Sequence, residues 1–245
     1  IDVSPMSILN KSQYSYLTEK QSFLFRIWKI IFYYYCKVVF LIYTPVKVLG
    51  RDNIPNEPSI FCSNHNSHMD VALIAHAAGK SFNHFGMLAA VDYWFDSSIK
   101  RVLTNLIMNL IPISRNSENK TKTISFDETI ALCNSFMELD KRNLIIFPEG
   151  SRGKPNVIKS FRKGAARFSL ALNKPIVPIY IEGSSKSWPK GKIFMRPCKI
   201  TINILEPIDP NDYISNQNDN VLNAKQLTTA LEEKIMKESK KHINE

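Results

Sequence analysis

The sequence predicts an α/β fold in which a mostly parallel central sheet is flanked by helices. Short apolar segments typical of strands alternate along the chain with segments that have helical spacing, and this alternation is the pattern of parallel α/β proteins. The composition agrees, because 44% of the 245 residues are hydrophobic and 22% are charged. A chain of this length buries roughly 70% of its unfolded surface, so it can form a full core without a disulfide framework.

The predicted strands are short apolar runs bounded by polar residues, glycine or proline. The clearest are the run NLIIF at residues 143–147 and the run PIVPIYIE at residues 175–182. Apolar runs without alternation are typical of strands that are buried on both faces of a parallel sheet. In chain order, strands are expected at residues 59–62, 110–113, 143–147, 175–182 and 200–205.

Helical spacing of the apolar residues predicts the segments that separate these strands. Helices are expected at residues 69–78, 126–139, 164–172 and 221–243, the last of them rich in lysine and glutamate. The polar, asparagine-rich stretch 215–220 is expected to be a linker. The expected divisions are an N-terminal helical membrane-association segment at residues 1–45, an α/β domain at residues 46–214, and a linker with a C-terminal helix at residues 215–245.

The N-terminal segment differs in composition from the rest of the chain. Residues 23–43 are aromatic and apolar, and their only charged side chains are Arg26, Lys29 and Lys37. These cations share one sector of a helix with Tyr33, which leaves the remaining circumference apolar. A narrow basic stripe on an apolar helix is typical of a helix that lies in a membrane interface. Two alternatives are a helix packed on the domain with its stripe in water, and a membrane span, which three cations would make unfavourable.

The net charge of +10 favours an anionic partner, such as a nucleic acid, an acidic lipid surface or an acidic protein. The sequence has no zinc-finger or RNA-recognition pattern, and outside the apolar helix it has no basic–aromatic stripe, so we expect no nucleic-acid partner. The cysteines are scattered without a C-x-x-C pair, which favours reduced core residues and no metal site. These are Cys36, Cys62, Cys133 and Cys198.

A histidine and an aspartate follow the strand predicted at residues 59–62. His65 lies in the turn and Asp70 near the start of the next helix. If the turn folds back over that helix, the Asp70 carboxylate orients the imidazole, and the other ring nitrogen can accept a proton. His68 competes for the role of base. The spacing Ser67-x-x-Asp70 also resembles a capping box, in which Asp70 would only begin the helix.

A second candidate is the loop Phe-Pro-Glu-Gly-Ser-Arg-Gly at residues 147–153, which follows a buried apolar strand. Its glycines let the backbone approach a ligand closely, and Ser151 and Arg152 offer donors suited to a phosphate. Ligands of open α/β sheets gather at the carboxyl ends of strands, where this loop would lie. The alternative is an ordinary turn with a surface arginine. Arg115, at the end of another apolar strand, and the basic segment 159–164 are weaker candidates for contacts with an anion.

Together these segments resemble the lysophosphatidate acyltransferase family of glycerolipid acyltransferases, over about residues 59–207. Five blocks occur in the family's order: N-H-x-x-x-x-D at 64–70, G-x-x-P-[VI]-x-R at 109–115, F-P-E-G-[TS]-R at 147–152, F-[KR]-x-G at 161–164 and V-P-[IV] at 177–179. The first and third blocks are the specific ones. One departure is visible, because Asn109 stands where the family usually has glycine, in a block that shapes the acceptor pocket.

The resemblance implies a glycerol-3-phosphate acyltransferase-like fold. It also implies an O-acyltransferase that esterifies a lysophospholipid, most directly 1-acylglycerol-3-phosphate, which would give phosphatidate. His65 would act as the base, and Asp70 would orient it. The acyl donor would be a thioester of coenzyme A or of acyl carrier protein, with no metal and no other cofactor. The substrate-binding residues that the resemblance implies are Arg115, Glu149, Gly150, Ser151 and Arg152.

An enzyme of this kind acts on a membrane lipid. We therefore expect it at the cytoplasmic face of a membrane, peripheral or monotopic through the N-terminal helix, whose cations would lie at anionic headgroups. Two alternatives stay open. One is acyl transfer to another lyso-lipid, which Asn109 motivates, and the other is a membrane lipid-binding module without catalysis, which the net charge of +10 motivates.

Overall fold

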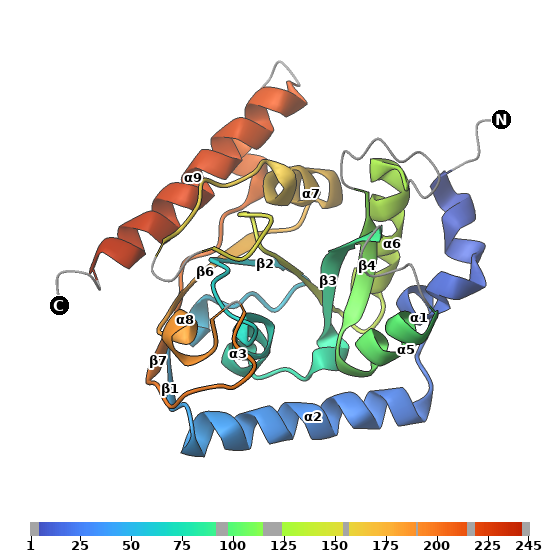
Figure 1. Cartoon of the computed structure of the whole chain (residues 1–245). Helices are drawn as coiled ribbons and strands as arrows, with labels where there is room; N and C mark the ends of the chain where they lie inside the picture. Colours follow the sequence, from blue (N-terminus) through green and yellow to red (C-terminus); the bar gives the residue numbers. More distant parts are fainter. Residues whose placement is uncertain are drawn as a thin grey trace. The chain divides into compact units, whose positions relative to one another are not determined.

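A computed structural model describes residues 5–91, 98–114, 124–153, 157–189, 191–214 and 219–241 (Figure 1). Its contacts divide the chain into two compact units. Unit 1 consists of Ile1–Tyr33 and Ser81–Ile145, and unit 2 consists of Tyr34–Lys80 and Ile146–Glu245. Helix α2 (Phe23–Ile42) begins in unit 1 and ends in unit 2. Both units have the α/β architecture that the sequence predicts.

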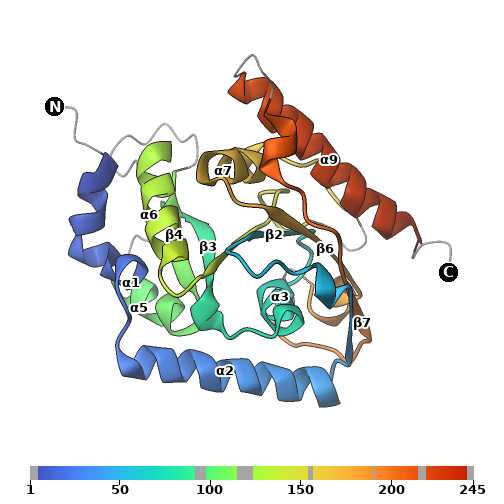
Figure 2. The same ribbon diagram turned by 180° about the vertical axis from the view of Figure 1, so that it is seen from behind.

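Unit 2 contains four neighbouring strands, in the order β1 (Val46–Leu49), β7 (Ile200–Ile204), β6 (Ile176–Glu182) and β2 (Ile60–Ser63). β1 pairs with β7 and β2 pairs with β6 in parallel, whereas β6 and β7 are antiparallel. The four residues of β2 are all buried. The helices of this unit are α3 (Asp70–Ala78), α7 (Gly164–Leu172), α8 (Ser184–Ser187) and α9 (Asn220–Lys241). Both views show α9 lying beside α7, and α9 also packs on β6 (Figures 1 and 2).

In unit 1, β3 (Phe85–Ala90) is paired in parallel with both β4 (Asn109–Ile113) and β5 (Asn143–Ile146). The helices of this unit are α1 (Ser15–Thr18), α5 (Ser98–Ile107) and α6 (Phe126–Glu138). A capping box opens α6, because the Ser125 hydroxyl accepts from the Glu128 N–H and the Glu128 carboxylate accepts from the Ser125 N–H. Short 3₁₀ helices occur at Pro5–Asn10, Ser12–Tyr14, Arg51–Asn53, Phe82–His84 and Pro210–Tyr213.

The strands and helices expected between residues 59 and 205 are confirmed within one or two residues, as is the C-terminal helix. β1, β3 and α5 were not expected. β1 has only four residues, which alternate between half-buried and exposed positions. β3 reads FGMLAA, which is poor in β-branched residues. The expected linker at 215–220 lies largely outside the described residues, and the expected divisions near residues 45 and 214 stay predictions.

Helix α2 is where the structure corrects the sequence analysis. The basic stripe was expected to face water or lipid headgroups, but Lys29 is 0% exposed and Tyr33 is also buried. With Cys36 and Phe40 they form the buried face of the helix. Most of the other apolar residues of α2 are exposed instead. The most exposed of them are Phe23, Leu24, Ile31, Tyr34, Tyr35, Val38, Leu41 and Ile42.

Lys29 is held by polar side chains of unit 1. Its ammonium nitrogen lies 2.5 Å from Gln21 Oε1 and 2.6 Å from Asn109 Oδ1. The Asn109 amide also donates to the carbonyl of Phe85, at the start of β3. Burial, with the nearby Arg142 guanidinium, lowers the pKa of Lys29 to about 7. Asn109 therefore anchors α2 through Lys29. Among the described residues, no helix combines the length and apolarity that crossing a membrane requires.

Candidate active site

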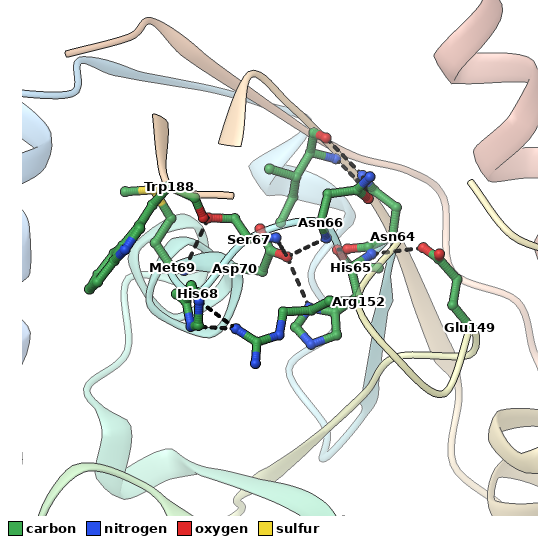
Figure 3. Close-up of polar contacts among 12 residues, drawn as sticks. Asn64, His65, Asn66, Ser67, His68, Met69, Asp70, Glu149, Arg152 and Trp188 are labelled. Atoms are coloured by element: carbon green, nitrogen blue, oxygen red, sulfur yellow. Dashed lines mark hydrogen bonds and ion pairs between the residues drawn. The ribbon is translucent and has the colours of Figure 1, made fainter. Parts of the chain in front are cut away.

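The turn between β2 and α3 brings His65 and Asp70 together (Figure 3). His65 Nδ1 lies 2.9 Å from Asp70 Oδ2, and the Asp70 side chain is completely buried. The same oxygen accepts from the backbone N–H groups of Asn66 and Ser67, each at 2.8 Å. Three donors therefore converge on one carboxylate oxygen, which fixes both the turn and the histidine ring.

The capping-box interpretation of Ser67 and Asp70 holds only in half. Asp70 accepts from the Ser67 N–H as a capping box requires, but the Ser67 hydroxyl accepts from the Met69 N–H at 3.3 Å, and the Met69 side chain makes no capping hydrogen bond at the start of α3. The Ser67 hydroxyl also donates to the carbonyl of Trp188, at 2.8 Å. Asp70 is thus both the first residue of α3 and the partner of His65.

The His65 ring is held from a second direction by Phe147. The two rings are stacked, with their centroids 3.8 Å apart and 15° between their planes. The His65 side chain keeps 19% of its exposure. Because the Asp70 carboxylate accepts the proton on Nδ1, the lone pair of Nε2 is available to accept a proton from a bound hydroxyl. This is the arrangement of a general base.

Glu149 holds the backbone on which His65 lies. Its buried carboxylate accepts from the His65 N–H at 2.8 Å through one oxygen and from the Lys159 N–H at 3.2 Å through the other. Burial raises the pKa of Glu149, and these two backbone hydrogen bonds oppose that rise. Gly153 completes this attachment, because its N–H donates to the His65 carbonyl at 2.8 Å. The 147–153 loop and the histidine turn thus form one hydrogen-bonded structure.

The tip of the loop carries the donors suited to an anion. The Arg152 guanidinium contacts the ring nitrogens of His68, and the Lys159 ammonium donates to the Ser151 hydroxyl at 3.0 Å. Burial and the Arg152 charge lower the pKa of His68, which favours the neutral ring that can accept from a guanidinium. The loop bends at Gly150, whose φ of 72° lies in the left-handed region. Two cationic side chains and one hydroxyl, those of Arg152, Lys159 and Ser151, therefore gather at the tip of the loop, with Arg152 beside His68.

Comparisons with known proteins show which family the chain belongs to. The sequence model of the family described as Acyltransferase matches residues 45–182, which is more than half of the chain. The chain belongs to the acyltransferase family. Over 177 residues it is 27% identical to a 1-acyl-sn-glycerol-3-phosphate acyltransferase of Limnanthes douglasii, covering 72% of this chain and 59% of that protein. A protein of the same name from Saccharomyces cerevisiae is 27% identical over 179 residues, covering 66% of this chain and 51% of the relative. The chain thus spans less than two thirds of either relative.

A solved structure extends the likeness of this acyltransferase chain to nearly its whole length. The 1-acyl-sn-glycerophosphate (LPA) acyltransferase PlsC from Thermotoga maritima aligns with a TM-score of 0.64 and 20% identity. The alignment covers 97% of this chain and 95% of that chain. At this identity the likeness concerns the fold, a mixed α/β arrangement with a mostly parallel central sheet flanked by helices.

In this acyltransferase chain, unit 2 brings together most of the predicted site residues. His65, Asp70 and the loop residues 149–152 all belong to it. Arg115 lies outside the described residues. Asn109 belongs to unit 1, where it binds Lys29. Within the part of the chain that the structure describes, no group of histidine, cysteine and carboxylate side chains is arranged to hold a metal ion.

Three residues that support the site were given no role from the sequence, although two of them, Asn64 and Phe147, begin the family blocks at 64–70 and 147–152. The Asn64 side chain pairs with the backbone of Ile181 in β6, accepting at 2.8 Å and donating at 2.9 Å. Phe147 stacks on His65, and the Trp188 carbonyl accepts from Ser67. The sequence signal for Asn64 was its position, because it is a polar residue directly after a buried strand. Nothing local indicates Trp188, which lies 121 residues from Ser67.

Proposed function

We propose that the chain transfers a fatty acyl group from an acyl thioester to a hydroxyl of a lysophospholipid, most directly 1-acylglycerol-3-phosphate, which gives phosphatidate. The observation that carries the proposal is the His65–Asp70 pair, with its 2.9 Å contact and fully buried carboxylate. The membership in the acyltransferase family and the names of the relatives support the same reaction.

The site residues account for each proton in this reaction. His65 Nε2 takes the proton of the acceptor hydroxyl as the oxygen attacks the thioester carbonyl carbon, and Asp70 stabilises the resulting imidazolium. The tetrahedral intermediate collapses as the ester forms and the carbon–sulfur bond breaks. The imidazolium returns the proton to the departing thiolate. His65 ends in its starting form, so the cycle needs no metal and no redox cofactor.

Binding of the acceptor is assigned to the loop tip. A phosphate suits the Arg152 guanidinium, with Ser151 and Lys159 beside it. Arg115 is proposed as a second phosphate ligand on the resemblance alone. Glu149 and Gly150 act by shaping the loop, because both oxygens of the Glu149 carboxylate are occupied by backbone N–H groups. The donor is proposed to be acyl-coenzyme A or acyl carrier protein, and both carry negative charge that suits a chain of net charge +10.

The location is proposed to be the cytoplasmic face of a membrane, with α2 lying in the interface. α2 turns its polar Lys29 inward and exposes Leu24, Ile31 and Leu41 to 77%, 54% and 77%. An exposed apolar arc of this kind is suited to an acyl-chain boundary, and the exposed Arg26 and Lys37 are suited to anionic headgroups.

The test of the chemistry is acyl transfer from acyl-coenzyme A and from acyl carrier protein to lysophosphatidate, followed by mass detection of the lipid product. His65→Ala should lower kcat by about 10² to 10⁴, and Asp70→Asn should lower it in the same direction. His68→Ala is the matched control, because it removes the competing histidine and should affect acceptor KM more than kcat. A folded His65→Ala protein that works at full rate would exclude His65 as the base.

A second candidate keeps the chemistry and changes the acceptor to another lyso-lipid. Asn109 motivated it, but the Asn109 side chain is bound to Lys29 and to backbone carbonyls of unit 1. A panel of acceptors decides the question, because preference for a phosphate-free acceptor would contradict a phosphate site at Arg152. A chain that binds lipid vesicles but transfers no acyl group to any acceptor would instead be a lipid-binding module.

A further inference from the structure

The segment 192–196 exposes two large apolar side chains that the proposed reaction does not use. Ile193 is 82% exposed and Phe194 is 83% exposed, the highest values among the large hydrophobic side chains of the described residues. The segment follows α8 in unit 2 and belongs to no helix or strand. Adjacent aliphatic and aromatic side chains at this exposure are unfavourable in water and indicate a surface that contacts another phase or molecule.

Hydrogen bonds hold this segment in place at both ends. The Trp188 indole N–H donates to the Lys192 carbonyl at 2.9 Å. At the other end, the Arg196 N–H donates to the Ser187 carbonyl at 2.9 Å, and the Ser187 hydroxyl donates to the Arg196 carbonyl at 2.8 Å. The loop is therefore built so that Ile193 and Phe194 project from a defined base.

The loop lies against the last turn of α2 within unit 2. The Tyr43 hydroxyl donates to the Met195 carbonyl at 3.0 Å. Leu41 and Ile42, which precede Tyr43, are 77% and 75% exposed. A direct hydrogen bond thus joins the backbone of segment 192–196 to Tyr43, the residue that follows α2.

The charges around the loop identify the chemistry of the partner. Lys192, Arg196 and Lys199 are all exposed. The whole stretch 183–205 contains no aspartate or glutamate. Apolar side chains flanked only by cations complement an anionic lipid surface, which offers an acyl region below negative headgroups.

We propose that segment 192–196 is a second membrane contact, in which Ile193 and Phe194 enter an anionic lipid interface while Lys192 and Arg196 lie at its headgroups. The loop also joins this surface to the catalytic turn, because the Trp188 carbonyl accepts from the Ser67 hydroxyl and from the His68 N–H. Segment 192–196 is therefore connected through Trp188 to the turn that carries His65. This proposal deepens the proposed membrane attachment through α2 and rests on it for the nature of the surface.

The test measures binding of the full chain to vesicles of phosphatidylcholine with phosphatidylglycerol, by co-sedimentation and without an acyl donor. The double variant Ile193→Ser/Phe194→Ser should weaken binding by about tenfold or more, because two large apolar side chains leave the interface. The matched control is Val221→Ser/Leu222→Ser on α9, where the side chains are 67% and 39% exposed. It should bind as the wild type does.

The charge arm of the experiment uses Lys192→Glu/Arg196→Glu, with Lys237→Glu/Lys240→Glu on α9 as its control. Only the first pair should weaken binding. Unchanged affinity of the Ile193→Ser/Phe194→Ser variant would overturn the proposal, as would a shift from dimer to monomer in that variant without vesicles, which would make the surface a contact between copies. Because no acyl donor is present, a failure of the proposed acyl transfer would appear only in the separate transfer assay.

Discussion

At the scale of single residues, the site depends on carboxylates that bind backbone N–H groups. Asp70 accepts from two backbone N–H groups as well as from His65, and Glu149 accepts from two others. A carboxylate held by several donors has little freedom to move, so it transmits its position to the group that it binds. His65, the proposed base, is therefore oriented by Asp70 through its ring and by Glu149 through its backbone.

Glu149→Gln should separate a positioning role from a substrate-binding role. The glutamine amide has only one acceptor oxygen, so one of the N–H groups of His65 and Lys159 loses its partner in a buried setting. We expect the free energy of unfolding to fall by about 1–3 kcal/mol. We also expect kcat to fall while acceptor KM changes little, because the displaced group is the base.

Steady-state kinetics with urea unfolding measures both quantities. Glu206→Gln serves as the control, because its side chain is 84% exposed, and it should leave both unchanged. A large rise in acceptor KM at constant kcat would place Glu149 in the acceptor site instead.

At the scale of elements, α2 differs from an ordinary surface helix, because it buries a lysine and exposes many of its large apolar side chains. Its buried face carries Lys29 and the aromatic side chains of Tyr33 and Phe40, and its exposed side is mostly apolar, with Arg26 and Lys37 among the exposed residues. In unit 2 the Phe40 ring packs edge-on against His76 of α3. The large apolar side chains gathered on the exposed side of α2 are unfavourable in water.

Lys29→Met should change the pH dependence of stability. The pKa of Lys29 falls from 10.5 to about 7 on folding, so between these values the unfolded chain binds one more proton than the folded chain. The free energy of unfolding should therefore rise with pH across this window, by up to about 1.4 kcal/mol per pH unit. Lys29→Met removes this contribution. The free energy of unfolding of the wild type minus that of the variant should therefore increase from pH 7 to pH 10.

Urea unfolding at several pH values measures the difference. The variant also removes the Lys29 donor from Gln21 Oε1 and from Asn109 Oδ1, which keeps the Gln21 amide as a donor, and neither amide oxygen titrates in this pH range. Lys225→Met, at an exposed position of α9, is the control, and its curve of unfolding free energy against pH should be parallel to that of the wild type. Parallel curves for Lys29→Met as well would mean that Lys29 stays charged in the folded chain.

The elements that the sequence predicted well are those whose signal is local. The runs at 143–147 and 175–182 are continuous apolar strands, and Asp70 begins a helix directly after a turn. The burial of Lys29 could not be predicted, because its partner Asn109 lies 80 residues away. The attachment of Glu149 to His65, 84 residues apart, shares this cause. Long-range hydrogen bonds of this kind leave no periodic pattern in the sequence.

At the scale of the whole molecule, the chemistry and the proposed lipid contacts occupy different parts of the chain. The family match covers residues 45–182, which include His65, Asp70 and Arg152. Helix α2 and the segment 192–196 both lie outside it.

Because the net charge is +10, the dependence of vesicle binding on ionic strength is the sharpest test of how the whole chain binds a membrane. Raising the ionic strength from about 0.01 M to about 1 M shortens the screening length from about 30 Å to about 3 Å. We expect binding to vesicles with phosphatidylglycerol to weaken at least tenfold over this range, because each basic residue near an anionic surface contributes about 1 kcal/mol at low salt. Binding to pure phosphatidylcholine vesicles should be weaker and change little. Salt-independent binding to both vesicle types would mean that the apolar side chains of α2 and segment 192–196 act alone, and that the positive charge serves the acyl donor instead.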